Sequence, residues 1–347
     1  MTMMNEEEEE AVPILEERLE YLASRGAMAC FPPCGRQDIL QVGNAFDLIL
    51  ISSNTTGDVT CNDSVINFPG NNFYKTLNPV MCQGSGSSVQ CHLECPQIHG
   101  EPIQFPIFNQ KIQVPLPNHL EGVAQERIYH DEKEQGTDNN SSSDRDDDDS
   151  QHNDDALKTL ATLLKTGRNS ARYVLTNASG ETIGIAPTNI FLWSDRDRVI
   201  VSDVDGTITR SNVRGVVDTI LTEQYTYCHH GVCEFLSSSS SLSSQTGTVR
   251  LLYLTSRPIG IANTTRKFLS QLRQKDTHQL PEGPLIGHSG SLPQVLLMEL
   301  VYRSIHEFKA AALQQHVVQP FARMGVKKVF LAGFGNTLMD MKVICPC

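Results

Sequence analysis

The stretch RVIVSDVDGTITRSN, residues 198–212, decides how the carboxyl-terminal half of this 347-residue chain is expected to fold. Three apolar residues, Val199 to Val201, run almost directly into Asp203-Val204-Asp205-Gly206-Thr207. A short continuous apolar run is typical of a strand that is buried on both faces of a parallel sheet. Ligands of such sheets bind beyond the carboxyl ends of the strands, and both aspartates fall there. The stretch therefore predicts a functional site at this strand end.

Similar apolar runs recur further along the chain. Residues 251–254 and 329–332 are expected to be two more buried strands, and residues 263–272 and 306–315 have the spacing of helices. Short buried strands that alternate with helices predict an α/β domain, with a Rossmann-like parallel sheet flanked by helices. The Ser-rich residues 237–244 are interpreted as a low-complexity loop inserted in this domain.

Asp203 and Asp205 are separated by a single residue. In extended backbone they point to the same side, and neighbouring carboxylates repel each other unless a cation lies between them. Mg²⁺ is the natural candidate because it is a hard cation that takes oxygen ligands. The plainer alternative is an Asp-rich turn. A calcium loop does not fit, since its twelfth position requires glutamate and this chain has Arg214 there.

Polar residues also follow the other predicted strands. They are Thr255, Ser256 and Arg257 after the second strand, Lys309 near a helix start, and Asn336 and Asp340 after the third strand. Each of them alone would suit a helix cap, a turn or a solvated surface. Their repeated placement after strands favours one site. Together they suit phosphoryl transfer, in which one carboxylate attacks phosphorus, another moves protons, and lysine, hydroxyl groups and Mg²⁺ offset charge.

These motifs resemble the haloacid dehalogenase superfamily of phosphatases, through DVDGT, a hydroxyl after a strand, a lysine and GNxxxD. Longer strings are similar to the lipin family of Mg²⁺-dependent phosphatidate phosphatases: RVIVSDVDGTITRSNVRG, LLYLTSRPIGIANTTRKFL, LPEGPLI, EFKAAAL and AGFGN. They occur in the expected order over about residues 171–340. The resemblance implies a haloacid dehalogenase-type fold and the hydrolysis of phosphatidate to diacylglycerol and phosphate in glycerolipid synthesis.

The resemblance also implies a role for each matching residue. Asp203 would be the nucleophile that forms an aspartyl-phosphate, and Asp205 would be the general acid and base. Thr255 and Lys309 would hold phosphate oxygens, with Ser256 as the nearest alternative to Thr255. The ligands of Mg²⁺ would be Asp203, the backbone carbonyl of Asp205, Asn336 and Asp340.

The amino-terminal region is expected to contain strands. NAFDLILISSNTTGDVTCNDSVINFPG, residues 44–70, resembles the lipin amino-terminal domain. In that family this region and the strands that precede the catalytic domain build one immunoglobulin-like β-sandwich. The expected division is an acidic tail with a short helix (1–37), a β region (38–117), an acidic low-complexity linker (118–170), strands that complete the sandwich (171–194) and the catalytic domain (195–347).

Composition limits the partners and the location. The net charge of -12 and the pI of about 5.4 argue against nucleic-acid binding. The acidic start lacks the features of a signal peptide, and no apolar stretch reaches the roughly 18 residues of a spanning helix. We expect a cytoplasmic protein that binds phosphatidate at the surface of the endoplasmic reticulum or nuclear membrane, with the nucleus as a second location.

Two features depart from the lipin pattern. Lipins usually begin with an amphipathic helix that binds membranes, whereas residues 1–20 are acidic here, so unaided binding to anionic membranes is not expected. The family similarity usually continues well beyond GNxxxD. We therefore expect a catalytic domain that is truncated at its carboxyl end.

The ten cysteines do not form a disulfide framework or paired CxxC units. The segment Cys228-His229-His230-Gly231-Val232-Cys233 offers zinc ligands at loose spacing. Reduced thiols in a loop are the favoured interpretation, which predicts a reducing compartment.

Two other functions stay open at this point. The first is a non-catalytic lipid-binding or regulatory protein, against which the presence of Asp203 argues. The second is a phosphatase of the same superfamily that acts on a soluble phosphate ester, which the motif chemistry alone does not exclude. Activity on soluble esters without activity on phosphatidate micelles would favour this second alternative.

Overall fold

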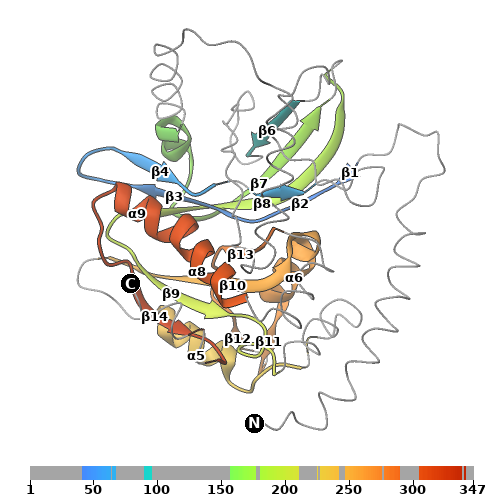
Figure 1. The fold of residues 1–347 in the computed structure, drawn as a ribbon, viewed down its shortest axis with the longest axis vertical. Helices are drawn as coiled ribbons and strands as arrows, with labels where there is room; N and C mark the ends of the chain where they lie inside the picture. Colours follow the sequence, from blue (N-terminus) through green and yellow to red (C-terminus); the bar gives the residue numbers. More distant parts are fainter. Residues whose placement is uncertain are drawn as a thin grey trace, which may run out of the picture.

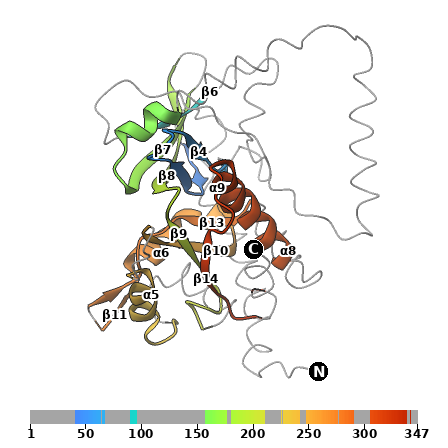
Figure 2. The ribbon, with the colours of Figure 1, turned by 90° about the vertical axis from the view of Figure 1, so that its left-hand side faces the viewer.

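Two larger β-sheets, together with two short two-stranded sheets, build the part of the chain that the structure describes (Figure 1). This computed structural model describes residues 41–63, 65–67, 90–95, 157–176, 180–210, 225, 227–241, 247–275, 277–289, 305–337 and 340. The short helix predicted within residues 1–37, and residues 96–117 of the predicted β region, lie outside these ranges. Viewed after a quarter turn, the two sheets form separate layers, with strand β8 of one leading into strand β9 of the other (Figure 2).

The smaller sheet contains four parallel strands in the order β13-β10-β9-β14. They are β9 (Arg198–Asp203), β10 (Val249–Pro258), β13 (Leu285–His288) and β14 (Phe330–Phe334). The predicted parallel sheet is therefore confirmed. In the pairing of β9 with β10, Asp203 lies opposite Leu254, so the aspartates at the end of β9 meet the polar residues 255–257 in the last part of β10 at one edge of the sheet.

Helices cover both faces of this sheet. One face carries α5 (Val232–Ser240), a tight turn η3 (Ile259–Ile261) and α6 (Ala262–Gln271); the other carries α8 (Ile305–Leu313), a π-helical turn η5 (Gln314–Val318) and α9 (Gln319–Arg323). Successive strand residues point to opposite faces, which is why Ile200 joins the first core while Val199 and Val201 join the second. A small hairpin, β11 (Arg273–Gln274) and β12 (His278–Gln279), follows α6.

The predicted Ser-rich loop at residues 237–244 is wrong at its start, because helix α5 continues through Ser240. Val232, Cys233 and Leu236 are buried, so packing stabilises the helix despite its weak helix formers. The serine hydroxyls also find acceptors locally: Ser239 Oγ donates to the Phe235 carbonyl at 2.8 Å. Buried residues at helical spacing before the serines were the signal that the compositional interpretation missed.

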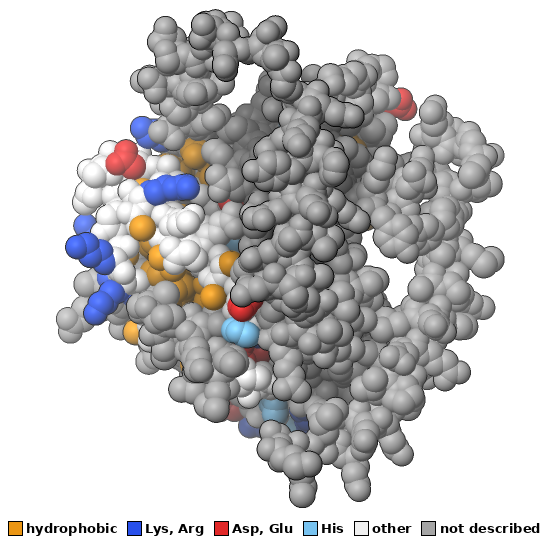
Figure 3. Space-filling view, in the orientation of Figure 1, with side chains coloured by type: hydrophobic (Ala, Val, Ile, Leu, Met, Phe, Trp, Pro, Cys, Tyr) orange, Lys and Arg blue, Asp and Glu red, His pale blue; other side chains and the backbone are white. Residues whose placement is uncertain are grey.

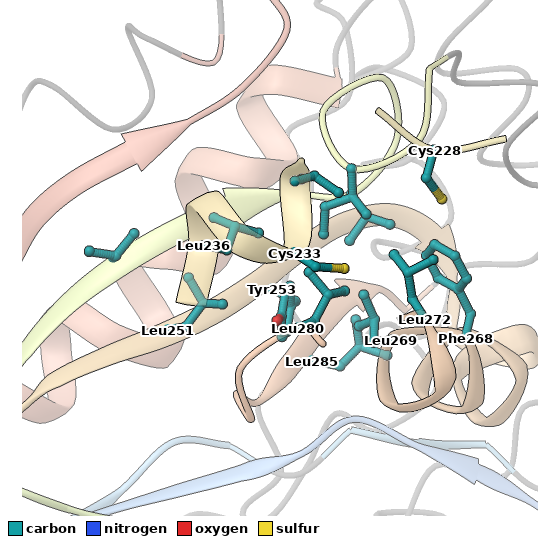
Figure 4. Packing of buried hydrophobic residues seen from close by; sticks show 14 of the residues in the cluster. Cys228, Cys233, Leu236, Leu251, Tyr253, Phe268, Leu269, Leu272, Leu280 and Leu285 are labelled. Atoms are coloured by element: carbon teal, nitrogen blue, oxygen red, sulfur yellow. The ribbon is translucent and has the colours of Figure 1, made fainter. Parts of the chain in front are cut away.

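The thiols of Cys228 and Cys233 lie in the core between α5, α6 and the sheet (Figure 4). Both cysteines are buried and neither forms a disulfide within the described ranges, whereas the neighbouring His229 and His230 are exposed. Burial raises the pKa of the Cys233 thiol to about 11. Cys233 lies in helix α5 and not in the predicted loop, and the reduced state of both thiols stays a prediction.

Strand β14 is less buried than its neighbours. Its residues alternate between half-buried and exposed, and Leu331 is 51% exposed. The space-filling view shows hydrophobic side chains among Lys and Arg, with an acidic group beside them, on the side where α9 lies in Figure 1 (Figure 3). This side of the molecule therefore presents apolar and basic groups together.

The larger sheet combines the amino-terminal strands with the strands that precede β9. Its order is β4-β3-β8-β7-β6, and β1 pairs with β8 as well. The strands are β1 (Gln41–Val42), β3 (Leu48–Ser52), β4 (Val59–Cys61), β6 (Gln90–Glu94), β7 (Gly167–Thr176) and β8 (Thr182–Ser194); a separate ladder joins β2 (Asn44–Ala45) to β5 (Ile66–Asn67). No second large sheet faces it within the described ranges, so the immunoglobulin-like sandwich stays a prediction.

Both faces of this larger sheet are covered. Leu48 and Leu50 face a helix at residues 157–163, while Ile49 and Ile51 face Phe308 and Phe321 of the smaller sheet's helices. The predicted linker, 118–170, therefore extends too far toward the carboxyl end, because this helix and the start of β7 lie within it. Leu157, Leu160 and Leu164 recur at helical spacing and are buried, which outweighs the polar residues around them.

A buried carboxylate joins the two sheets. Asp47 accepts hydrogen bonds from the backbone and side-chain nitrogens of Asn189, both at 3.0 Å, from Arg266 Nε at 3.1 Å and from the Leu285 backbone nitrogen at 2.8 Å. These donors belong to β8, α6 and β13. A fully bonded buried carboxylate fixes the larger sheet against the smaller one.

Across the described residues, no helix is both long enough and apolar enough to cross a membrane.

His316 makes a second buried connection between the sheets. Its Nδ1 lies 3.1 Å from Asn62 Nδ2, and Asn62 Oδ1 accepts a hydrogen bond from the Ile49 backbone nitrogen at 2.6 Å. Because the amide nitrogen of Asn62 is a donor, Nδ1 accepts and the ring is neutral. Burial lowers the pKa of His316 to about 4.

We predict that His316 makes the fold sensitive to acid. Its folded-state pKa lies below the unfolded value of 6.5, so its contribution is complete above that pH and is lost as the pH falls toward 4. The free energy of unfolding in urea should drop by roughly 3 kcal/mol more in the unmodified protein than in His316→Gln between pH 7 and 4. His230→Gln, an exposed control, should keep the original slope. Equal slopes for the protein and His316→Gln would contradict the assignment.

Candidate functional site

Asp203, the last residue of β9, meets a lysine and a second carboxylate at the carboxyl edge of the smaller sheet. Asp203 Oδ1 accepts a hydrogen bond from Lys309 Nζ at 2.9 Å, and Asp203 Oδ2 accepts one from Thr207 Oγ1 at 3.2 Å. The same Lys309 Nζ donates to Asp340 Oδ1 at 2.7 Å. All three charged side chains are buried. One ammonium group therefore connects β9, α8 and the segment after β14.

Burial and mutual charge set the ionisation of this trio. Burial, reinforced by Asp205 and Asp340, raises the pKa of Asp203 to about 7 against the opposing effect of Lys309. Burial also opposes the charge on Lys309, but its two carboxylate partners raise the pKa of the lysine overall. Asp340 is likewise buried, yet Lys309 and Thr337 lower its pKa. Of the two bridged carboxylates, Asp203 is thus the one that changes charge near neutral pH.

Asp205 has a different set of partners, because the backbone turns immediately after Val204. Gly206 has a φ of 81°, a left-handed conformation that favours glycine, and the Ile208 nitrogen donates to the Val204 carbonyl at 2.9 Å. Asp205 Oδ2 accepts from Thr255 Oγ1 at 2.8 Å, and Oδ1 accepts from Arg257 Nε at 2.9 Å and Nη2 at 2.8 Å. The two aspartates of the DVDGT motif are therefore neutralised by different cations.

The structure thus gathers the predicted catalytic residues into two adjoining networks. Asp203 and Lys309 share the first, and Asp205 and Thr255 share the second. The Thr255 hydroxyl is fully buried and already donates to Asp205, whereas Ser256 beside it is half-buried. The role of Thr255 as a phosphate ligand stays a prediction.

Arg257 is the site residue that the sequence analysis placed near the strand end without giving it a role. It is 2% exposed and forms a two-armed ion pair with Asp205. Its guanidinium also lies over the ring of Phe268, 5.5 Å from the centroid. The number of charged residues could have pointed to Arg257. Three carboxylates buried at one edge need more positive charge than Lys309 alone supplies.

Asp340 is held in place by the loop that follows β14. Its Oδ2 accepts from the Thr337 backbone nitrogen at 3.1 Å and from Thr337 Oγ1 at 2.7 Å. A Cβ at Gly335 would overlap the Asp340 side chain, so glycine makes room for this carboxylate. Asn336 lies between them in the loop and is exposed.

The oxygen donors at this edge fit a hard divalent cation. Asp203 Oδ1 and Asp340 Oδ1 approach one ammonium group, so both are within reach of a common cation. The carboxylate of Asp205 is turned to Arg257, which leaves its backbone carbonyl as the donor that the sequence analysis expected. In the described residues, no three His, Cys, Asp or Glu side chains cluster as a metal site. The expected set requires only two carboxylates, with Asn336 and the carbonyl.

A family pattern matches the part of the chain that contains this site, and several known proteins match about half of the chain. The LNS2 (Lipin/Ned1/Smp2) family pattern matches residues 149–344. The chain is 32% identical over 186 residues to Nuclear elongation and deformation protein 1 of Schizosaccharomyces pombe, covering 54% of this chain and 26% of that protein. It is 33% identical over 187 residues to Phosphatidate phosphatase LPIN1 of Homo sapiens, covering 54% and 19%.

A plant relative gives a similar result. The chain is 32% identical over 186 residues to Phosphatidate phosphatase PAH1 of Arabidopsis thaliana, covering 51% of this chain and 18% of that protein. The chain thus spans between 18% and 26% of the length of these three relatives. The family match covers more than half of the chain and includes every residue of the site described above. This protein therefore belongs to the LNS2 (Lipin/Ned1/Smp2) family.

Proposed function

We propose that this protein is a Mg²⁺-dependent phosphatidate phosphatase, a phosphoric monoester hydrolase that converts phosphatidate to diacylglycerol and phosphate. The single observation that carries the proposal is the buried Asp203 at the end of β9, held by Lys309 beside Asp340. The names of two relatives, Phosphatidate phosphatase LPIN1 and Phosphatidate phosphatase PAH1, supply the substrate. Charge neutralisation at a strand edge is what phosphoryl transfer demands of a protein.

In the proposed first step, Asp203 acts as the nucleophile. A carboxylate oxygen bonds to phosphorus, and the bond from phosphorus to the glycerol oxygen breaks. Lys309 lies 2.9 Å from Asp203 Oδ1 and is close enough to offset negative charge that develops on the transferring group. Asp205 supplies a proton to the departing glycerol oxygen, which releases diacylglycerol.

In the second step, water attacks the phosphorus of the aspartyl-phosphate. Asp205 takes the proton from the water, and the bond between phosphorus and Asp203 breaks with its electron pair returning to the carboxylate. Bound Mg²⁺ would supply positive charge next to the phosphoryl oxygens. The residues that would hold it are Asp203, the carbonyl of Asp205, Asn336 and Asp340.

We place the proposed reaction at a membrane surface, because phosphatidate is a lipid. The exposed apolar and basic groups on the α9 side support contact with anionic lipid (Figure 3). The proposed location is cytoplasmic, peripheral to the endoplasmic reticulum or nuclear membrane, with the nucleus as a second location. A lipid-binding protein without catalysis, and a phosphatase for soluble esters, are the alternatives that the following test separates.

We predict that the protein releases phosphate from phosphatidate in detergent micelles only when Mg²⁺ is present. Asp203→Asn should lower the rate at least about 1,000-fold, because an amide is a poor nucleophile. The variant should still fold, since Lys309 keeps Asp340 as its partner. Asp58→Asn, the same change at an exposed turn, should leave the rate unchanged.

The outcomes of this assay separate the three functions. Mg²⁺-dependent release that disappears in Asp203→Asn supports the proposal. Release from p-nitrophenyl phosphate but not from phosphatidate would favour the soluble-ester phosphatase. Binding of phosphatidate vesicles without any release, by a protein with a cooperative unfolding transition, would favour the non-catalytic alternative.

The position of Asp340 gives a separate prediction. In Gly335→Ala the added methyl group overlaps the Asp340 side chain, so the carboxylate must move. The Mg²⁺ concentration for half-maximal activity should rise about 10-fold or more. Gly260→Ala is a matched control, because a Cβ there meets nothing within 4 Å. An unchanged Mg²⁺ requirement in a folded Gly335→Ala variant would remove Asp340 from the proposed metal site.

A further inference from the structure

The ion pair between Arg257 and Asp205 is closed off from solvent. The two side chains are 2% and 5% exposed, and the guanidinium places two nitrogens, Nε and Nη2, on one carboxylate. Such a two-armed contact fixes orientation as well as distance, which a lysine does not do. The carboxylate of Asp205 therefore has one defined position in the fold.

Thr255 also bonds the Asp205 carboxylate and helps to fix its position. Its hydroxyl donates to Asp205 Oδ2 at 2.8 Å, and it accepts a hydrogen bond from the Arg257 backbone nitrogen at 3.1 Å. That second bond occupies a lone pair of the hydroxyl and directs its proton to the carboxylate. Both oxygens of Asp205 are thus bonded by donors from the end of β10.

Arg257 itself is held by packing. Its guanidinium lies over Phe268 of α6, with the carbon 5.5 Å from the ring centroid, and Phe268 is buried in the core. The third nitrogen, Nη1, is buried and has no hydrogen-bond partner among the described residues. A buried donor without an acceptor lowers stability. Placing this arginine here costs stability, which points to a functional reason for its position.

We propose that Arg257 is a positioning residue, which holds the Asp205 carboxylate as the base that receives the proton of the attacking water. This role rests on the proposed phosphatase function and deepens it. Donors from the end of β10 bond both oxygens of Asp205, so its carboxylate is held in one orientation beside the nucleophile Asp203. Loss of Arg257 should therefore slow the hydrolysis of the aspartyl-phosphate. Its formation should be slowed less when the leaving group departs without a proton and so needs no acid.

The two steps separate with p-nitrophenyl phosphate as substrate. Its leaving group departs without a proton, so formation of the aspartyl-phosphate by Asp203 does not depend on Asp205. Hydrolysis still requires transfer of a water proton to Asp205. In Arg257→Gln we expect a rapid burst of p-nitrophenol that approaches one equivalent per enzyme, followed by a steady state about 100-fold slower than in the unmodified protein. KM should change less than kcat.

Three further variants make the test specific. Arg257→Lys keeps the charge and should give a smaller burst with intermediate turnover, because it lacks the two-armed contact. Thr255→Val should also give a burst, since it removes the donor to Oδ2. Arg266→Gln removes a different, half-buried arginine, which pairs with Asp47 in the scaffold, and should give no burst. A residue with a purely structural role would lower burst and turnover together.

The outcomes are distinct for the inference and for the function on which it rests. A burst in Arg257→Gln and Arg257→Lys that is absent in the unmodified protein and in Arg266→Gln supports the role of Arg257. Equal loss of burst and steady state in folded Arg257 variants overturns it, while the phosphatase function stands. An unmodified protein that does not turn over p-nitrophenyl phosphate or phosphatidate overturns both.

Discussion

The structure depends on the neutralisation of two carboxylates placed one residue apart at the end of β9. Asp203 and Asp205 cannot both be buried and charged without partners, because each would carry an uncompensated charge in a medium of low polarity. The fold assigns a separate cation to each, Lys309 from α8 and Arg257 from β10. Burial raises the pKa of Asp203 to about 7 despite its lysine partner, whereas the two-armed contact gives Asp205 a fixed orientation. The roles proposed for them, an attacking group and a proton carrier, rest on that difference in environment.

The larger sheet supports this arrangement from a distance. Helix α8 contributes Lys309, which bonds Asp203. The preceding residue of the helix, Phe308, packs into the core that also contains Ile49 and Trp193 of the larger sheet. Asp47 anchors the same sheet to α6 and β13. The amino-terminal strands are therefore part of the scaffold that holds the site, and changes in their core should reach the strand edge through α8.

Much of this could be predicted from local sequence, because strands β9, β10 and β14 are short apolar runs that end in polar motifs. The positions of Asp203 and Asp340 follow from parallel strands sharing one edge, whereas Lys309 reaches that edge from helix α8. The partner of Asp205 could not be predicted in the same way, since no periodicity tells which side chain of the Thr255-Ser256-Arg257 string turns toward it. Helix α5 and the helix at 157–163 were missed because composition was weighed above a few buried residues at helical spacing. The ionisation of Asp203 depends on burial, which only the assembled fold defines.

The central claim is that Asp203 becomes phosphorylated during turnover. The most direct measurement is rapid acid quenching of the protein with radiolabelled phosphatidate and Mg²⁺, followed by mass spectrometry of the peptide that contains β9. The account predicts one phosphoryl group on Asp203 that hydroxylamine removes, as expected of an acyl phosphate, and none in Asp203→Asn. Continued turnover without a labelled enzyme, or a label on any other residue, would contradict it.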